Sequence, residues 1–201
     1  MDAPTGTQTS PNSQKTSRVI SATFHPSMAE NTGSGATLPI LWIQRGHSFK
    51  KRLAFLLSTA VGVGHVPWAP GTFGSLLAAV LYLRFGSLPV WGQFLLISAT
   101  AASGIWAISV MEQHTGKHDD QRIVIDEVVG MWITLFAFPP GWFTFLAGFA
   151  LFRAMDILKP FPADWVDRKW RGAKGVMFDD VVAGIYARAL LFLLLRFGHL
   201  S

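Results

Sequence analysis

Cysteine is absent from the 201-residue sequence, and charged side chains make up only 14% of it. Without cysteine the chain has neither a disulfide framework nor a thiolate metal site, so redox chemistry does not indicate its compartment. Soluble domains carry roughly 25% charged residues, so this scarcity, beside 50% hydrophobic residues, favours a membrane protein. A very apolar soluble bundle is the alternative that composition leaves open.

Charge is missing altogether from two long stretches, residues 85–111 and 128–152. Each exceeds the ~20 residues that cross a hydrocarbon core of about 30 Å. The first includes the clearest predicted span, residues 88–111, with Trp91 and Trp106 near its ends as interfacial anchors. Pro139, Pro140 and Gly141 interrupt the second stretch, and proline cannot continue a helix interior. The sequence therefore predicts an all-α integral membrane helical bundle that contains a hairpin broken at Pro-Pro-Gly.

The N-terminal residues differ in composition from the rest. Residues 1–36 are rich in Ser, Thr, Pro, Gly and Asn and lack an apolar period, so we predict a disordered tail followed by a single membrane-embedded domain, residues 37–201. No apolar stretch follows the early basic residues, so a secretory signal is not indicated, and Met28 is an alternative start. Residues 53–63 are too short to span and predict a re-entrant or interfacial helix.

Glycine and proline are concentrated at residues 62–75, before an apolar helix predicted from about Ser75 to Phe85 with Thr72 or Ser75 as its N-cap. A Gly-rich turn before a helix leaves backbone N–H groups beside the positive end of the helix dipole, where phosphate binds well. An ordinary structural turn is the alternative.

Acidic residues are few, and ten of the twelve lie between Glu112 and Asp180. They include adjacent pairs at 119–120, 126–127 and 179–180, and the hairpin places the last two pairs on one membrane face. Adjacent carboxylates repel unless they face water or share a cation, and oxygen ligands without cysteine suit Mg²⁺. For Asp179 and Asp180 the alternative is a place in the first turn of the last helix, predicted from about Asp179 to Arg196, where the helix dipole favours negative charge. His114 and His118 could bind a transition metal at helical spacing, although Gly116 between them weakens the helix.

Basic residues cluster at the ends of apolar segments, which is typical of the positive-inside rule and of anionic lipid partners rather than of nucleic-acid binding. Those at 153–174 predict that the charged loops are cytoplasmic. Asp156 with Lys159 and Asp164 with Arg168 have the spacing of helix-surface ion pairs, which is the alternative to a role in function. Carboxylates for a metal beside Lys and Arg for phosphate oxygens favour phosphoryl transfer.

Three blocks of residues stand out: G-V-G-H-V-P-W-A-P-G-T-F-G-S at 62–75, I-V-I-D-E-V-V-G-M-W at 123–132, and F-R-A-M-D-I-L-K-P-F-P-A-D-W-V-D-R with G-V-M-F-D-D-V-V-A-G at 152–184. Together they resemble the phosphatidylglycerophosphatase A family of Mg²⁺-dependent lipid phosphatases. The resemblance covers residues 53–196 and leaves the first fifty without a counterpart. It implies a multi-pass enzyme of the bacterial inner membrane, among membrane lipids, that hydrolyses phosphatidylglycerophosphate to phosphatidylglycerol and inorganic phosphate.

The motif positions imply a set of site residues whose individual roles we infer. The predicted catalytic acids are Asp126, Glu127, Asp156, Asp167, Asp179 and Asp180. We predict that Mg²⁺ is held by Asp126, Glu127, Asp179 and Asp180, and that phosphate is received by Thr72, Gly74, Ser75, Lys159 and Arg168. Direct attack by water and a phosphorylated aspartate both stay open, as do the number of metals and the oligomeric state.

Two other functions are alternatives. A cation transporter or channel that uses the boundary carboxylates predicts ionisable residues inside the spans, where only Arg188 lies. A transferase that joins an alcohol to a nucleotide-activated lipid has a charged motif similar to residues 167–180, but the Ala-Arg pair and the later aspartates of that motif are missing.

Overall fold

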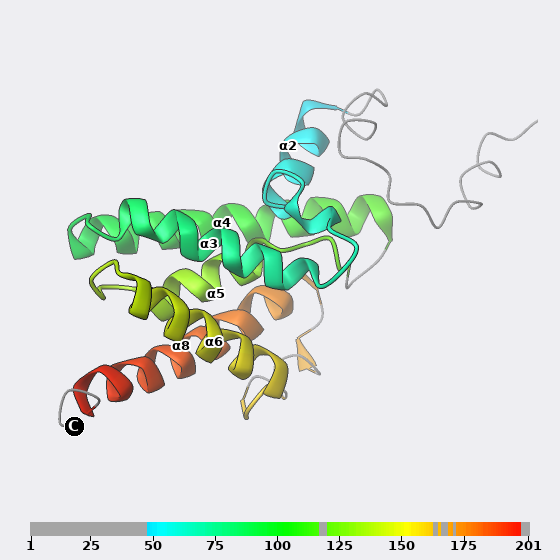
Figure 1. The fold of residues 1–201 in the computed structure, drawn as a ribbon. Coiled ribbons are helices and arrows are strands. Elements are labelled where there is room, and N and C mark those ends of the chain that lie inside the picture. Colours follow the sequence, from blue (N-terminus) through cyan, green and yellow to red (C-terminus); the bar gives the residue numbers. More distant parts are fainter. Residues whose placement is uncertain (1–47, 117–119, 163–164, 166–168, 171, 198–201) are drawn as a thin grey trace, which may run out of the picture. The chain divides into compact units, whose positions relative to one another are not determined.

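The computed structural model describes residues 48–116, 120–162, 165, 169–170 and 172–197. These residues form helices and turns without a strand, which confirms the all-α prediction for this part of the chain (Figure 1). The predicted tail lies outside it, as do the predicted site residues Asp167 and Arg168, and also His118, Asp119 and Asp164. The helices are α2 (Phe49–Ser58), η2 (Val63–His65), α3 (Pro70–Phe85), α4 (Val90–Thr115), α5 (Ile125–Leu135), α6 (Trp142–Leu158) and α8 (Ala173–Phe197).

Helix α5 is the core helix, and it packs against α3, α4, α6 and α8 (Figure 1). Nine of its eleven residues are buried, as expected for a helix that is apolar nearly all round. It crosses α8 closely, because a Cβ atom at Gly184 would lie only 2.5 Å from the carbonyl oxygen of Gly130. Small residues permit such close backbone contact between helices. The crossing brings the acidic start of α5 beside Asp179 and Asp180, which precede Gly184 by about one turn.

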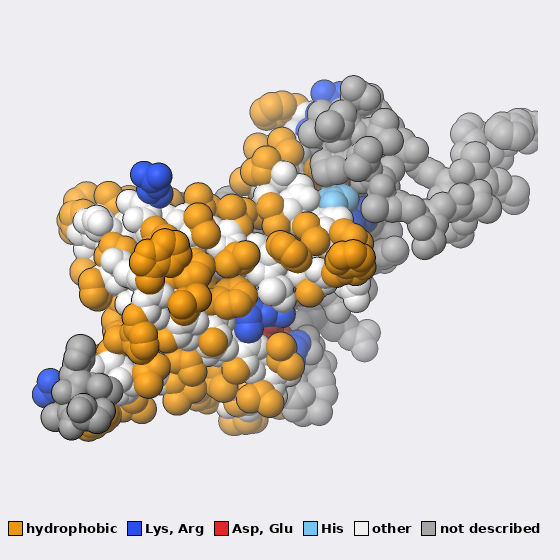
Figure 2. Space-filling model, in the orientation of Figure 1, with side chains coloured by type: hydrophobic (Ala, Val, Ile, Leu, Met, Phe, Trp, Pro, Cys, Tyr) orange, Lys and Arg blue, Asp and Glu red, His pale blue; other side chains and the backbone are white. Residues whose placement is uncertain are grey.

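The outer faces of the helices are apolar. Phe94 on α4 is 65% exposed, Leu146 on α6 is 61% exposed and Phe192 on α8 is 57% exposed. Figure 2 shows hydrophobic side chains over most of the face in view, with charged side chains sparse among them. Exposed apolar surface of this extent marks an interaction surface. Within the part of the chain that the structure describes, α4 is the one helix long and apolar enough to cross a membrane, with a mean hydropathy of 1.8 over the relevant window.

Helix α3 begins at Pro70, so the predicted start near Ser75 and the predicted N-cap are wrong. The residue before the helix is Ala69, and it makes no side-chain capping bond. Proline is favoured in the first turn because its fixed φ suits a helix and its missing N–H has no partner there in any case. The Ser75 hydroxyl instead donates a 2.7 Å hydrogen bond to the Gly71 carbonyl inside the helix.

Helix α8 begins at Ala173, six residues before Asp179, so the first-turn alternative for Asp179 and Asp180 is also wrong. The dipole effect fades within the first turn, and these acids lie in the second. The Ala173 N–H donates to the Glu112 carboxylate, with 3.2 Å between nitrogen and oxygen. A side chain 61 residues away in the sequence therefore satisfies one of the N–H groups at this helix start.

The link between α5 and α6 contains Pro139, Pro140 and Gly141. Two side chains hold it in place: the Tyr82 hydroxyl donates to the Phe138 carbonyl at 2.9 Å, and the Ala137 N–H donates to the Gln93 side-chain oxygen at 2.9 Å. Hydrogen bonds from α3 and α4 therefore hold the backbone that joins the end of α5 to the start of α6.

Candidate active site

Five carboxylates from three helices meet at the end of the bundle where α5 and α8 begin. They form two overlapping groups, each with one carboxylate oxygen per residue within 4.8 Å of the others. Asp180 belongs to both groups, so the five form one continuous set, which we call the carboxylate cluster. Its members are Asp126 and Glu127 on α5, Asp156 on α6, and Asp179 and Asp180 on α8. The structure thus brings together five of the six acids that the sequence predicts, while Asp167 lies outside the described residues.

Asp126, Asp179 and Asp180 are buried, and Glu127 and Asp156 are half-buried. The charge-free run of α5 begins just after the cluster at Val128, and the first charged residue of α8 after Asp180 is Arg188. Burial raises the pKa of Glu127, and the charges of Asp126 and Asp180 raise it further. Burial likewise raises the pKa of Asp180, with added repulsion from Asp126 and Asp156. Carboxylates this close cannot all be ionised unless a cation balances them.

The donor atoms of the cluster fit a hard divalent cation. Asp126 Oδ1 and Glu127 Oε2 are buried and accept no hydrogen bond from any residue in the described ranges. A buried carboxylate oxygen without a partner is costly, and coordination to a metal removes that cost. The ligand atoms are carboxylate oxygens only, which is the chemistry that Mg²⁺ prefers.

Two basic side chains contact the cluster. Lys159 lies just after α6 with φ of 45°, a left-handed conformation that favours glycine, and its ammonium lies 2.6 Å from Asp179 Oδ2. Such strained positions persist where the surrounding structure enforces them, often at functional sites. Arg153, one turn before Asp156 on α6, forms an ion pair with Asp156. Arg153 was not among the predicted site residues.

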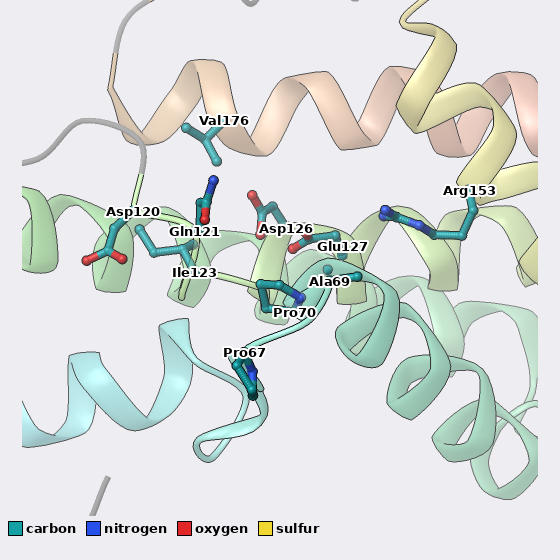
Figure 3. Close-up of a pocket in the computed structure, with 11 residues that line it drawn as sticks. Pro67, Ala69, Pro70, Asp120, Gln121, Ile123, Asp126, Glu127, Arg153 and Val176 are labelled. Atoms are coloured by element: carbon teal, nitrogen blue, oxygen red, sulfur yellow. The ribbon is translucent and has the colours of Figure 1, made fainter. Parts of the chain in front are cut away.

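A cavity of about 400 Å³ opens beside the cluster. Its wall includes Asp126 and Glu127 from α5, Arg153 from α6, and Pro70 and Gly71 from the start of α3 (Figure 3). The volume is in the usual range for small-molecule sites. A phosphorylated headgroup could therefore enter between the carboxylates and the guanidinium.

Comparison with known proteins identifies the family. Residues 56–195 match the family model of phosphatidylglycerophosphatase A. The chain belongs to this family. It is 38% identical over 145 residues to phosphatidylglycerophosphatase A of Escherichia coli, covering 72% of this chain and 83% of the relative. It is 42% identical over 139 residues to the Haemophilus influenzae protein of the same name, covering 68% and 85%.

A third relative in the comparison has a different name. It is a putative phosphatidylinositol-3-phosphatase of Bacteroides thetaiotaomicron, 40% identical over 147 residues, which cover 69% of this chain and 91% of the relative. No solved structure matches the chain. The resemblance found in the sequence to phosphatidylglycerophosphatase A is thus confirmed, and both kinds of name describe phosphatases.

The glycine-rich block of this phosphatidylglycerophosphatase A family member, residues 62–75, covers η2, the link after it and the first turns of α3. Ser75 is fully buried, and Gly74 packs against α5's entry loop, since a Cβ there would lie 2.8 Å from the Val124 Cβ. Gly71 is the glycine that contacts the cluster: its Cβ would lie 2.2 Å from Glu127 Oε1. No spacing in the sequence distinguishes Gly71 from the neighbouring glycines, because the distinction depends on how α3 faces α5.

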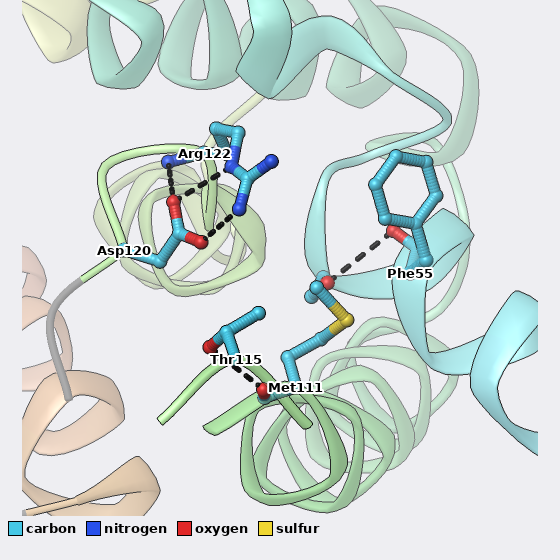
Figure 4. Close-up of polar contacts among 6 residues, drawn as sticks. Phe55, Met111, Thr115, Asp120 and Arg122 are labelled. Atoms are coloured by element: carbon cyan, nitrogen blue, oxygen red, sulfur yellow. Dashed lines mark hydrogen bonds and ion pairs between the residues drawn. The ribbon is translucent and has the colours of Figure 1, made fainter. Parts of the chain in front are cut away.

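One further buried acid, within the residues that match the phosphatidylglycerophosphatase A family model, is paired with a basic side chain. Asp120 is buried and accepts hydrogen bonds from Arg122, with 2.8 Å between Arg122 Nε and Asp120 Oδ1 (Figure 4). The bond to Asp120 raises the pKa of the Arg122 guanidinium. The Val124 N–H, two residues on, donates to the Ser58 carbonyl at 2.8 Å. This ion pair therefore fixes the loop that leads into Asp126.

Proposed function

We propose that the protein removes the terminal phosphate of phosphatidylglycerophosphate to give phosphatidylglycerol and inorganic phosphate. The observation that carries this is the buried carboxylate cluster beside a cavity with an arginine in its wall, in a chain of the phosphatidylglycerophosphatase A family. In the reaction a water oxygen bonds to phosphorus, the bond from phosphorus to the glycerol oxygen breaks, and that oxygen leaves with a proton.

Mg²⁺ is the proposed cofactor, held by Asp126, Glu127, Asp179 and Asp180. When bound, it supplies polarisation of the phosphate oxygens and balances the carboxylate charges. The fit of the donor set supports this assignment. Asp156 and Asp167 complete the proposed catalytic acids.

The proposed phosphate-binding groups start from those expected from the motifs. Lys159 has the most direct support, since its ammonium lies at the edge of the carboxylate cluster. Arg168 would add positive charge from the sequence between α6 and α8. Thr72 lies in the first turn of α3, where the helix dipole favours an anion, and Gly74 and Ser75 follow it in the second turn.

An integral membrane location fits the proposed substrate. The exposed apolar faces of α3, α4, α6 and α8 would contact lipid, with the α5–α6 hairpin turning at Pro-Pro-Gly. Trp91 and Trp142 are exposed at the starts of α4 and α6, the ends far from the cluster, where interfacial anchors are expected. Helix α2, with exposed Phe49 beside Lys50, would lie at the cytoplasmic surface of a bacterial inner membrane.

Phosphate release from phosphatidylglycerophosphate tests the proposal. Protein purified in detergent is assayed with Mg²⁺ and with chelator, comparing wild type, Asp179→Asn and the matched control Asp2→Asn, which lies outside the family blocks. We expect release that requires Mg²⁺, is lost in Asp179→Asn and is retained in the control. No release from a well-folded wild type would contradict the proposed function.

The Bacteroides relative's name makes a second substrate worth the same assay. Phosphatidylinositol 3-phosphate also carries a phosphate monoester on a lipid headgroup, but on a ring oxygen rather than on a primary glycerol oxygen. We expect faster release from phosphatidylglycerophosphate, measured with both lipids at equal mole fraction in mixed micelles. The reverse order would assign the inositol lipid instead.

A further inference from the structure

Arg153 connects the cavity to the carboxylate cluster. Its side chain is 19% exposed and forms an ion pair with Asp156. It also lines the cavity opposite Asp126 and Glu127, and Figure 3 shows it extending from α6 toward Glu127. Among the described residues in the cavity wall, Arg153 is the one with a positive charge.

Gly71 shows how close Arg153 and the carboxylates are. A Cβ atom at Gly71 would lie 2.2 Å from Glu127 Oε1 and 3.4 Å from Arg153 Nη1. The guanidinium and a proposed metal-binding carboxylate therefore converge on the same backbone position. That position is in the first turn of α3, where the helix dipole is positive. An anion held in the cavity beside this position would meet the positive start of α3 and the Arg153 guanidinium, while the cation proposed to bind the carboxylates would balance the charge of Glu127.

Two other basic side chains in the described part of the chain also contact acids, and neither of them lines this cavity. Arg122 forms its ion pair with Asp120, and the ammonium of Lys159 contacts Asp179 on α8. Arg153 uses Nη1 for Asp156. A guanidinium has five N–H donors in a planar fork, so one carboxylate contact leaves donors for a second oxyanion.

We propose that Arg153 binds the non-bridging oxygens of the phosphate that is removed, across the cavity from the carboxylates that hold the cation, while its contact with Asp156 keeps the guanidinium oriented. This rests on the proposed function. Phosphoryl transfer spreads charge over the equatorial phosphate oxygens, and a guanidinium fixed beside them stabilises that charge. Glycine at position 71 leaves room for the Glu127 carboxylate beside the Arg153 guanidinium, and the phosphate would lie in the adjoining cavity.

The test uses inorganic phosphate, the reaction product, as its probe. Wild type, Arg153→Gln, Arg153→Lys and the control Arg84→Gln, an exposed residue at the far end of α3, are compared in detergent. Phosphate binding with Mg²⁺ present is measured by calorimetry, Mg²⁺ binding is measured alone, and kcat and KM are measured with phosphatidylglycerophosphate. We expect Arg153→Gln to lower kcat by about 10²–10³, the usual cost of one lost charge-stabilising donor. We also expect weaker phosphate binding with Mg²⁺ binding retained, partial recovery in Arg153→Lys, and no change in the control.

Unchanged phosphate affinity in Arg153→Gln would overturn the proposal. In that case Arg153 only orients Asp156, and the double variant with Asp156→Asn would lose no more activity than Asp156→Asn alone. If Arg153→Gln fails to fold, the Arg153→Lys variant provides the test. Wild-type phosphate affinity and wild-type kcat in Arg153→Lys would contradict a role for the planar guanidinium. A wild type that binds phosphate through Arg153 but does not act on phosphatidylglycerophosphate would refute the proposed function and keep this inference. A wild type that binds no phosphate with Mg²⁺ would refute the inference.

Discussion

Two sets of buried acids lie close together in the chain and differ in how their charge is balanced. Asp120 accepts hydrogen bonds from the Arg122 guanidinium, and this ion pair holds a loop. Six residues later Asp126 and Glu127 join a cluster of five carboxylates, and each has a buried oxygen that accepts no hydrogen bond from the described residues. Burial of an acid is thus no sign of function by itself. The two sets differ in charge balance: Asp120 is paired with Arg122, whereas the clustered carboxylates carry excess negative charge that a bound cation would balance.

The largest effect is expected when the cluster loses a carboxylate. Asp126→Asn removes a proposed metal ligand, so phosphate release should fall by at least about 10³-fold, because metal assistance contributes several kcal/mol. The metal-free protein should unfold at the same temperature as wild type or higher, since repulsion is relieved. A phosphate assay measures the rate of release, and thermal unfolding in detergent measures the unfolding temperature. Activity within ten-fold of wild type would place the metal elsewhere.

A smaller loss is expected from Gly71→Ala. The added methyl group would lie 2.2 Å from Glu127 Oε1, so the carboxylate or α3 must move. Displacement of a site by about 1 Å can cost 10²-fold, and we expect a fall in kcat of that order. Gly141→Ala is the matched control, because no described residue other than its chain neighbours has an atom within 4 Å of its Cβ position. Equal activity in the two variants would show that Gly71 is not constrained by the cluster.

Five acids that the sequence predicts lie together in the structure, and their catalytic roles stay predictions. Two acidic pairs and the family blocks identify them without a structure: Asp126, Glu127, Asp156, Asp179 and Asp180. Their assembly depends on α5 crossing α8 at glycines, which no spacing reveals. The start of α8 was missed because Lys174 and the two aspartates make residues 173–180 resemble a charged loop, although both aspartates are buried. Arg153 was missed for a related reason: its position one turn before Asp156 suggests only a helix-surface pair.

Asp120→Asn should affect stability rather than chemistry. It leaves Arg122, whose side chain is 31% exposed, without its carboxylate. Loss of a fully buried pair partner costs about 3–5 kcal/mol, and access to water reduces this to about 1–2 kcal/mol here. Chemical unfolding in mixed micelles measures the change, and phosphate release well below the unfolding temperature should stay within ten-fold of wild type. The double variant Asp120→Asn with Arg122→Gln should regain part of the lost stability, and a larger loss in it would contradict the ion-pair explanation.

The smallest effect is a difference in pH dependence with and without metal. The pKa values of Asp126, Glu127 and Asp180 are raised, chiefly by burial, so the folded metal-free protein binds more protons than the unfolded chain. Stability should therefore fall as pH rises from the ordinary carboxyl pKa of about 4 toward the raised values. Bound Mg²⁺ favours the ionised carboxylates and should flatten or reverse this dependence of stability on pH.

Thermal unfolding between pH 5 and pH 8, with chelator and with Mg²⁺, measures the pH dependence in both states. The Asp120→Asn variant should show the same difference between them as wild type, because the charge of Asp120 is balanced by Arg122 outside the cluster. Parallel slopes with and without Mg²⁺ would mean that the cation does not bind among these carboxylates, and the distinction between the two sets of acids would then rest on hydrogen bonding alone.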